Sequence, residues 1–112
     1  MIDASAIRDI LEMYSKHGWV LRRVLLSKDL KERIGAEIIR LLAGIQVDES
    51  DIDAAWFSRP PKNSSVAWEI RHLSEMPYAL LQNADENLDG FEDSLHAVEE
   101  RLRETVLTAK SA

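Results

Sequence analysis

The chain contains no cysteine among its 112 residues. This absence excludes disulfide bonds, thiolate zinc sites, iron–sulfur clusters and cysteine nucleophiles. It also suits a reducing compartment, so we expect a cytoplasmic protein. A basic n-region and an apolar h-region are missing from residues 1–20, because Asp9, Glu12 and Lys16 interrupt them. No signal peptide is therefore expected.

Long apolar runs and an excess of basic charge are missing as well. The apolar run Leu41–Val47 is far too short to cross a bilayer, so no membrane segment is expected. The net charge is −6 and no basic stripe is present, which argues against a nucleic-acid partner. The chain has neither a G-x-S-x-G nucleophile motif nor a glycine-rich phosphate loop. We therefore assign no catalytic residue and no cofactor.

The charge that is present is unevenly distributed along the chain. Residues 1–40 carry eight Lys or Arg and six Asp or Glu, whereas residues 41–112 carry six and fourteen. Opposite net charges attract, so the two parts of the chain could attract each other within one molecule or between two.

Helical spacing of apolar residues recurs throughout, and no two-residue alternation is long enough to indicate a strand. The sequence therefore predicts an all-α fold, a single domain over residues 1–112. Short connections predict an antiparallel bundle of four main helices plus a short helix near 51–57. The main helices are expected at about 3–26, 29–43, 64–88 and 91–106, and a proline-rich crossing loop at 59–63. Asp3 is the expected N-cap of the first helix, and either Ser27 or Asp29 caps the second. The last helix has the clearest apolar stripe: Phe91, Leu95, Val98, Leu102 and Val106.

Two residues lie inside these predicted helices although they disfavour helix. Gly18 keeps the apolar phase of the first helix, so one continuous helix with a weak point is expected. Pro77 removes a hydrogen bond inside the fourth helix, which predicts a kink there. The alternative is that a new helix begins at Pro77.

The strongest metal motif is Asp85-x-Asn87-x-Asp89-Gly, the first half of a calcium-binding EF-hand loop. The twelfth position should be a bidentate glutamate but is His96. We therefore expect no metal site here but an acidic turn with Asp89 as a helix cap, and calcium binding by Asp85, Asn87 and Asp89 is the alternative. The three histidines, His17, His72 and His96, fall on three different predicted helices. A bundle could bring them together, and His72 is the candidate metal ligand among them.

The stretch Trp68-Glu-Ile-Arg-His72-Leu resembles the helix that supplies one metal-binding histidine in DinB-like four-helix bundles. The resemblance covers about twenty-five of the 112 residues. That family adds a paired H-x-x-x-H further along the chain, whereas here only His96 follows. The resemblance implies a small-molecule or metal-binding bundle as the alternative function, with an enzyme as one form of it.

The aromatic residues indicate the preferred function. Trp19 and Trp68 fall outside the predicted core stripes, and Trp, Met and Arg are enriched at the centres of protein interfaces. The alternative is that both tryptophans pack inside the protein. We predict a non-enzymatic protein-interaction or self-association module, with a homodimer or another protein as partner. The predicted interaction surface consists of Trp19, Arg22, Arg23, Trp68, Arg71, His72 and Met76.

Overall fold

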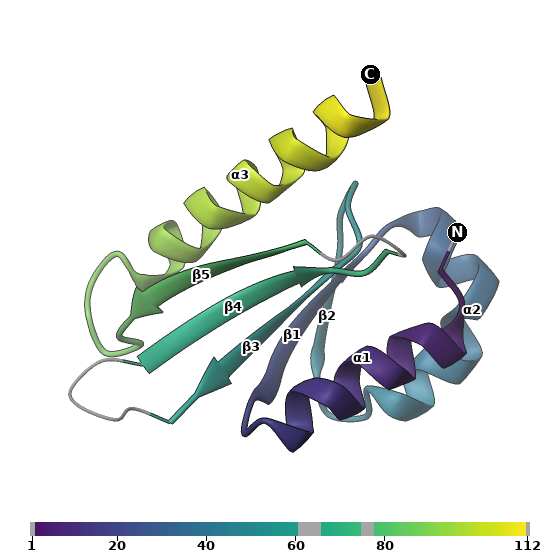
Figure 1. Cartoon of the computed structure of the whole chain (residues 1–112), viewed down its shortest axis with the longest axis horizontal. Helices are drawn as coiled ribbons and strands as arrows, with labels where there is room; N and C mark the ends of the chain where they lie inside the picture. The colour runs from purple at the N-terminus through teal and green to yellow at the C-terminus, as the bar shows by residue number, and fades with distance from the viewer. Residues whose placement is uncertain (1, 61–65, 75–77, 112) are drawn as a thin grey trace.

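A computed structural model describes residues 2–60, 66–74 and 78–111 (Figure 1). This part of the chain forms an α/β fold with three helices and a five-stranded mixed sheet, so the prediction of an all-α bundle is wrong. The elements in chain order are α1 (Ala4–Lys16), β1 (Val20–Leu26), α2 (Lys28–Leu41), β2 (Gln46–Glu49), β3 (Ala54–Arg59), β4 (Val66–His72), β5 (Ala79–Ala84) and α3 (Phe91–Ser111).

The strands are ordered β2-β1-β3-β4-β5 across the sheet. β1 and β2 pair in parallel, with α2 connecting them, and all other neighbours are antiparallel. Arg59 and Pro60 therefore precede a connection between two adjacent strands, not a crossing between helices, and residues 61–65 lie outside the described part. None of the described helices has the length and apolar character needed to cross a membrane.

The sheet separates two hydrophobic cores, with α1 and α2 on one face and α3 on the other (Figure 1). Apolar residues of both faces are almost completely buried. The core beneath α1 and α2 contains Ile2, Ala4, Ile7, Tyr14, Val24, Leu26, Leu30, Ile38, Leu42, Ala55, Phe57 and Leu73. The core beneath α3 contains Leu25, Ile52, Ala54, Trp56, Trp68, Ile70, Leu95, Val98, Leu102 and Val106.

The predicted first helix is divided at Gly18. The glycine has a φ of +84°, a left-handed conformation that ends α1 and that other residues adopt only with strain. The chain then enters β1, where Val24, Leu25 and Leu26 are all buried because both faces of the sheet are covered. Such a strand reads as a continuous apolar run and shows no alternation.

The predicted helix at 51–57 is also wrong, because this segment contains a strand whose two faces are both covered and which therefore shows no alternation. The residues from Ala54 to Ser58 are all buried in β3, and successive side chains enter opposite cores. Ala55 and Phe57 face α1, whereas Ala54 and Trp56 face α3.

Two antiparallel strands, β4 and β5, replace the predicted fourth helix. In β4, Trp68 and Ile70 enter the core under α3, whereas Glu69 points to the other face and bonds to Tyr14. This alternation was present in the sequence but extends over only a few residues. Pro77, which was expected to kink or to begin a helix, lies outside the described residues.

Three local predictions are confirmed. Asp3 caps α1, since its side chain accepts a hydrogen bond from the Ala6 amide at 2.8 Å. Ser27 caps α2 in the same way, through the Leu30 amide. The predicted stripe of the last helix is also correct, and its buried members are Leu95, Val98, Leu102 and Val106.

Candidate functional site

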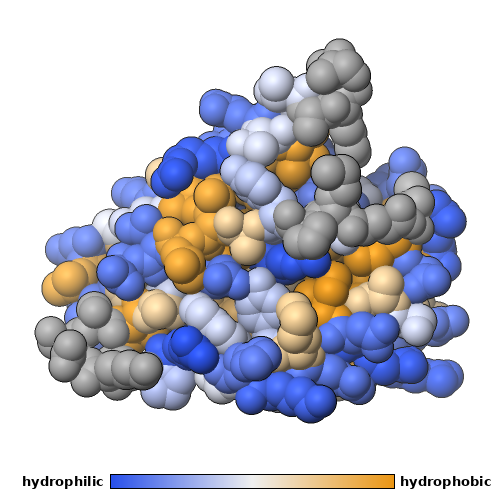
Figure 2. All heavy atoms as spheres, viewed as in Figure 1, coloured by the Kyte–Doolittle hydropathy of each residue, from blue (hydrophilic) through white to orange (hydrophobic). Residues whose placement is uncertain are grey.

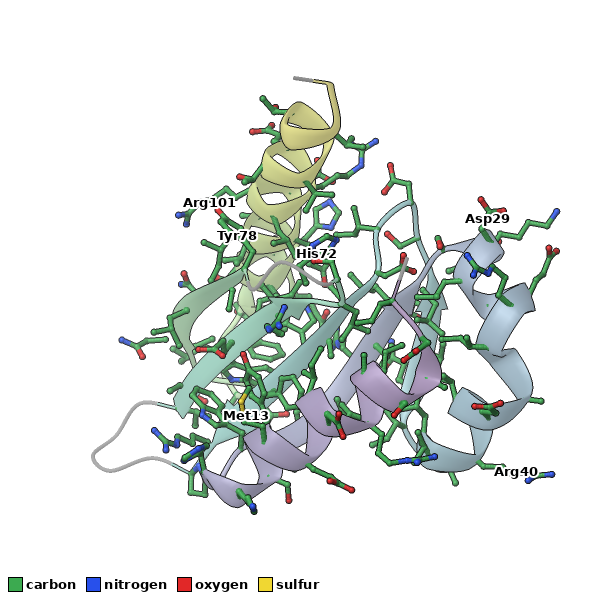
Figure 3. All side chains as sticks on the ribbon, turned by 45° about the vertical axis from the view of Figure 1, so that its right-hand side comes forward. Met13, Asp29, Arg40, His72, Tyr78 and Arg101 are labelled. Atoms are coloured by element: carbon green, nitrogen blue, oxygen red, sulfur yellow. The ribbon has the colours of Figure 1, made fainter. Side chains whose placement is uncertain are left out.

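The outer edge of the sheet at β5 has no neighbouring strand in the part of the chain that the structure describes (Figure 1). The His72 amide donates to the Tyr78 carbonyl at 2.8 Å, which continues the β4–β5 ladder. Figure 3 shows these two residues side by side at the end of the sheet. Hydrogen-bonded pairs alternate along an antiparallel ladder, so the next ones involve Leu80, Gln82 and Ala84.

The backbone groups of the intervening residues therefore point away from β4. These residues are Ala79, Leu81 and Asn83, and we call their outward N–H and C=O groups the β5 edge. One side-chain contact agrees with this direction, because the Asn83 carbonyl accepts a hydrogen bond from the Gln82 side chain at 3.2 Å. A sheet edge of this kind is a template for pairing with another strand.

The β5 edge is uncharged and partly apolar. No residue from Ala79 to Ala84 carries a charge, and the structure shows neither a bulge in the β4–β5 register nor a proline in the strand. Leu81 is 66% exposed, and Ala79 and Asn83 are exposed on either side of it. Figure 2 shows apolar surface over β5 with hydrophilic surface around it. Charged residues, bulges and prolines are three of the common protections of an edge strand, and β5 has none of these three.

The opposite edge of the sheet, at β2, differs in each of these respects. It has four residues, and two of them are Asp48 and Glu49. A second strand of the same kind would bring like charges together, which opposes pairing. The two sheet edges are therefore unequal, and only the β5 edge is suited to accept a strand.

The layer formed by α1 and α2 reaches β4 through Tyr14. The Tyr14 hydroxyl donates to the Glu69 carboxylate, and its ring stacks on Phe57 with the centroids 4.0 Å apart. Burial raises the pKa of Tyr14 well above its ordinary value, and the bond to Glu69 raises it further. These contacts fix α1 over β3 and β4, while the outer face of β5 at Leu81 stays exposed.

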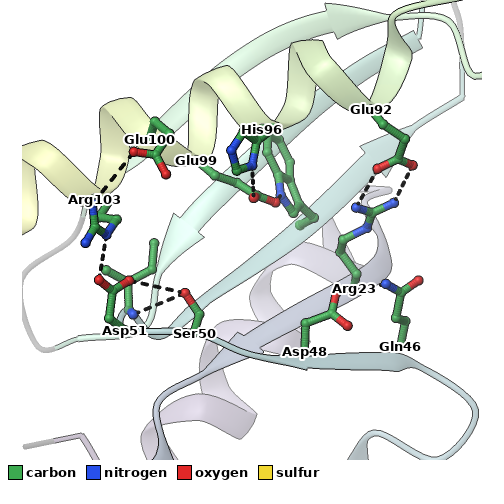
Figure 4. A network of polar contacts seen from close by, with 12 residues as sticks. Arg23, Gln46, Asp48, Ser50, Asp51, Glu92, His96, Glu99, Glu100 and Arg103 are labelled. Atoms are coloured by element: carbon green, nitrogen blue, oxygen red, sulfur yellow. Dashed lines mark hydrogen bonds and ion pairs between the residues drawn. The ribbon is translucent and has the colours of Figure 1, made fainter.

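A polar cleft of about 330 Å³ lies on the other face, between α3 and the β1–β2 side of the sheet (Figure 4). The Arg23 guanidinium makes two bonds to Glu92, at 3.0 and 3.1 Å, and Arg103 bonds to Asp51 at 2.6 Å. The cleft is lined by Arg23, Leu25, Asp48, Glu49, Ser50, Asp51, Ile52, Glu92, His96, Glu99, Glu100 and Arg103.

The carboxylates of this cleft are largely engaged by the protein itself. Hydrogen bonds from Arg23 and Arg103 lower the pKa values of Glu92 and Asp51 respectively. Glu99 accepts a hydrogen bond from the indole Nε1 of Trp56 at 2.6 Å. In the described ranges, no three His, Cys, Asp or Glu side chains are grouped so that they could hold a metal ion. The polar contacts across this cleft therefore hold α3 against the sheet.

A register shift in the β1–β3 pairing lies at Arg22. Arg22 and Arg23 both make contacts on the α3 side: Arg22 bonds to Glu86 at 2.8 Å, and its guanidinium lies 4.9 Å from the Trp68 ring centre. A bulge can direct consecutive side chains to one face. Arg22 and Arg23 thus connect the basic first part of the chain to acidic residues of the second part within one molecule.

The predicted interaction surface is not assembled on one helix, because its central row lies on β4. Trp68 is 1% exposed and Arg71 is 8% exposed, so both belong to the interior. Trp19 is half-buried and stacks with the Arg59 guanidinium at 4.9 Å. His72 is half-buried at the end of β4, and Met76 lies outside the described residues.

The alternative metal ligands form no group of three or more His, Cys, Asp or Glu side chains in the part of the chain that the structure describes. α3 begins at Phe91, so the EF-hand pattern that starts at Asp85 cannot continue as a loop to its twelfth position. The Asn87 amide instead donates to Asp85 Oδ1 at 2.9 Å, which closes a turn. His17 caps the end of α1 and His96 lies exposed on α3.

The DinB-like resemblance fails at the level of secondary structure. Trp68–His72 is part of β4, whereas the resemblance required a helix. The four-helix bundle that the resemblance implied is therefore incompatible with this fold.

Sequence reasoning missed the β5 edge. A signal was nevertheless present: residues 76–84 contain no charge in a chain that is 30% charged. In the all-α prediction this run was part of the helix expected at 64–88, so it was not interpreted as an edge strand.

Comparison with protein-family models, curated protein sequences and solved structures finds no match to this chain. The function of the site has to be inferred from the residues themselves.

Proposed function

We propose that the chain is a non-enzymatic protein-interaction module whose β5 edge pairs with an extended strand of another polypeptide. The observation that carries this proposal is the uncharged edge formed by Ala79, Leu81 and Asn83, which has no neighbouring strand among the described residues. Strand addition uses main-chain hydrogen bonds for affinity and alternate side chains for specificity. We keep a cytoplasmic location, expected from the cysteine-free sequence, as part of the proposal.

Leu81 supplies the apolar contribution to this pairing. Full burial of a leucine side chain is worth about 1.5–3 kcal/mol, and Leu81 is 66% exposed in the free chain. Covering it would therefore contribute roughly 1–2 kcal/mol, which corresponds to about a tenfold change in affinity. The remaining affinity comes from the backbone groups of the β5 edge.

The test uses a synthetic peptide with the sequence of residues 78–84 as the incoming strand. The isotope-labelled protein is titrated with this peptide while backbone amide signals are recorded. We expect the amides of Ala79, Leu81 and Asn83 to shift and to gain protection from hydrogen exchange, because they acquire acceptors.

Leu81→Lys and Leu88→Lys form a matched pair of variants. The two leucines are 66% and 65% exposed, but Leu88 lies outside the strand. We expect Leu81→Lys to weaken peptide binding about tenfold or more, and Leu88→Lys to leave it unchanged. Equal effects of both variants, or amide shifts away from β5, would refute the proposed function.

A further inference from the structure

We infer that the strand received by the β5 edge is β5 of a second copy of the chain, which rests on the proposed function. The two strands pair antiparallel about a two-fold axis beside Leu81. Leu81 then lies opposite Leu81 of the second copy, and Ala79 lies opposite Asn83. The result is a continuous ten-stranded sheet across two molecules.

The positions of the outward-pointing residues determine this register. The β5 edge offers three such residues, and Leu81 is the middle one. A two-fold axis at the middle residue pairs every outward group of one copy with an outward group of the other. A shift by one residue would place inward-pointing groups opposite outward ones and leave the edge unbonded.

The side chains on the exposed face suit the same register. Leu81 is flanked along its strand by the smaller residues Ala79 and Asn83. The two Leu81 side chains can therefore contact each other without obstruction from their neighbours. In the row behind, Glu69 lies opposite Leu81 in the β4–β5 ladder, and Arg71 lies opposite Ala79. The Asn83 carbonyl can keep its bond to Gln82, because a carbonyl oxygen accepts two hydrogen bonds.

Charge favours β5 over the other edge as the contact between copies. Each copy carries a net charge of −6, so two copies repel each other at long range. Pairing through β5 brings no charged residue to the new ladder, whereas pairing through β2 would bring Asp48 and Glu49 of both copies together. A β5–β5 contact is also closed by its two-fold axis, while a β2–β5 contact would continue into a fibre.

The absence of cysteine allows a direct test by single-cysteine cross-linking, with oxidised glutathione as the oxidant. Opposite residues of a hydrogen-bonded pair have Cα atoms about 5.5 Å apart, within the range of a disulfide. We expect Leu81→Cys to form a disulfide dimer roughly a hundredfold faster than Leu88→Cys, since pairing holds the two thiols at a high effective concentration.

Two further variants test the register. In the proposed pairing, two copies of residue 79 lie about 13 Å apart along the strands, which is too far for a disulfide. Ala79→Cys and Asn83→Cys should therefore not cross-link alone, whereas an equal mixture of them should cross-link to each other. Circular dichroism checks that all variants are folded.

The outcomes separate this inference from the proposed function. Concentration-dependent dimer mass in sedimentation, with rapid cross-linking of Leu81→Cys, supports the second copy as partner. Cross-linking of Ala79→Cys alone as fast as Leu81→Cys would overturn the register. A monomeric protein whose Leu81→Cys variant cross-links no faster than Leu88→Cys would overturn the inference that the partner strand comes from a second copy. If the 78–84 peptide still bound at β5, the proposed function would stand; if it did not, both would fail.

Discussion

Trp56 and Trp68 offer a matched comparison of two buried indoles that differ in one hydrogen bond. They lie in the core under α3 with ring centroids 6.2 Å apart, and they are 0% and 1% exposed. Trp56 Nε1 donates to Glu99, whereas Trp68 Nε1 has no hydrogen-bond partner among the residues that the structure describes. We therefore compare Trp56→Phe with Trp68→Phe.

The expected difference follows from the two Nε1 groups. Trp56→Phe loses a hydrogen bond to a carboxylate, which is worth about 1.5–3 kcal/mol. Trp68→Phe removes a buried donor whose missing partner costs about 1–3 kcal/mol in the native protein. Both variants lose the same ring atoms, so this loss largely cancels. Because the Glu99 side chain is still 18% exposed, water can partly replace its lost donor. We expect Trp56→Phe to be less stable than Trp68→Phe by about 2–4 kcal/mol.

Urea unfolding followed by far-ultraviolet circular dichroism measures this difference without relying on tryptophan fluorescence. At about 1–3 kcal/mol per molar urea, the two midpoints should differ by about 1 M or more. Loss of the contact between the Arg22 guanidinium and Trp68 would offset only about 0.5–1 kcal/mol. A Trp68→Phe midpoint equal to or below that of Trp56→Phe would refute the reasoning. As a control, a double-mutant cycle with Glu99→Ala, which removes the acceptor, should show coupling to Trp56 but not to Trp68.

Two further predictions concern Tyr14 and the glycines. Burial raises the folded-state pKa of Tyr14, so its stabilising contribution is present below the ordinary tyrosine pKa of about 10 and is lost as the pH rises above it. The stability advantage of the wild type over Tyr14→Phe should therefore shrink between pH 8 and pH 11 in urea titrations, and a constant advantage would contradict the assignment. Gly18→Ala should destabilise the protein by roughly 1–2 kcal/mol because φ is +84°, whereas Gly35→Ala, inside α2, should stabilise it by up to about 1 kcal/mol. Melting temperatures that move in the same direction for both variants would count against this explanation.

Elements with one buried face were predictable from the sequence. α2 and α3 each expose one side to solvent, so their apolar residues recur with helical spacing and their ends carry recognisable signals such as Ser27. The central strands lack such a pattern because helices cover both faces of the sheet there. The residues from Ala54 to Ser58 are buried without interruption, and nothing in their order distinguishes a doubly covered strand from a short buried helix.

The candidate site was less predictable than the individual helices, because it depends on which strand lies at the edge of the sheet. The order of strands is set by long-range pairings such as β1 with β3, and no local pattern records them. Trp68 was expected at a surface because its phase was judged against a helix. On β4 the same residue alternates inward with Ile70 and is buried in the core under α3.

The order of the strands also bears on how the chain folds. β3, β4, β5 and α3 follow one another both in sequence and in space, so their contacts close short loops. β1 lies between β2 and β3, and its pairing of Leu25 with Ala54 spans the whole of α2 and β2. Contacts between distant residues cost more chain entropy and form more slowly than local ones. The insertion of β1 into the middle of the sheet, rather than the formation of any helix, is therefore the step that should limit the rate of folding.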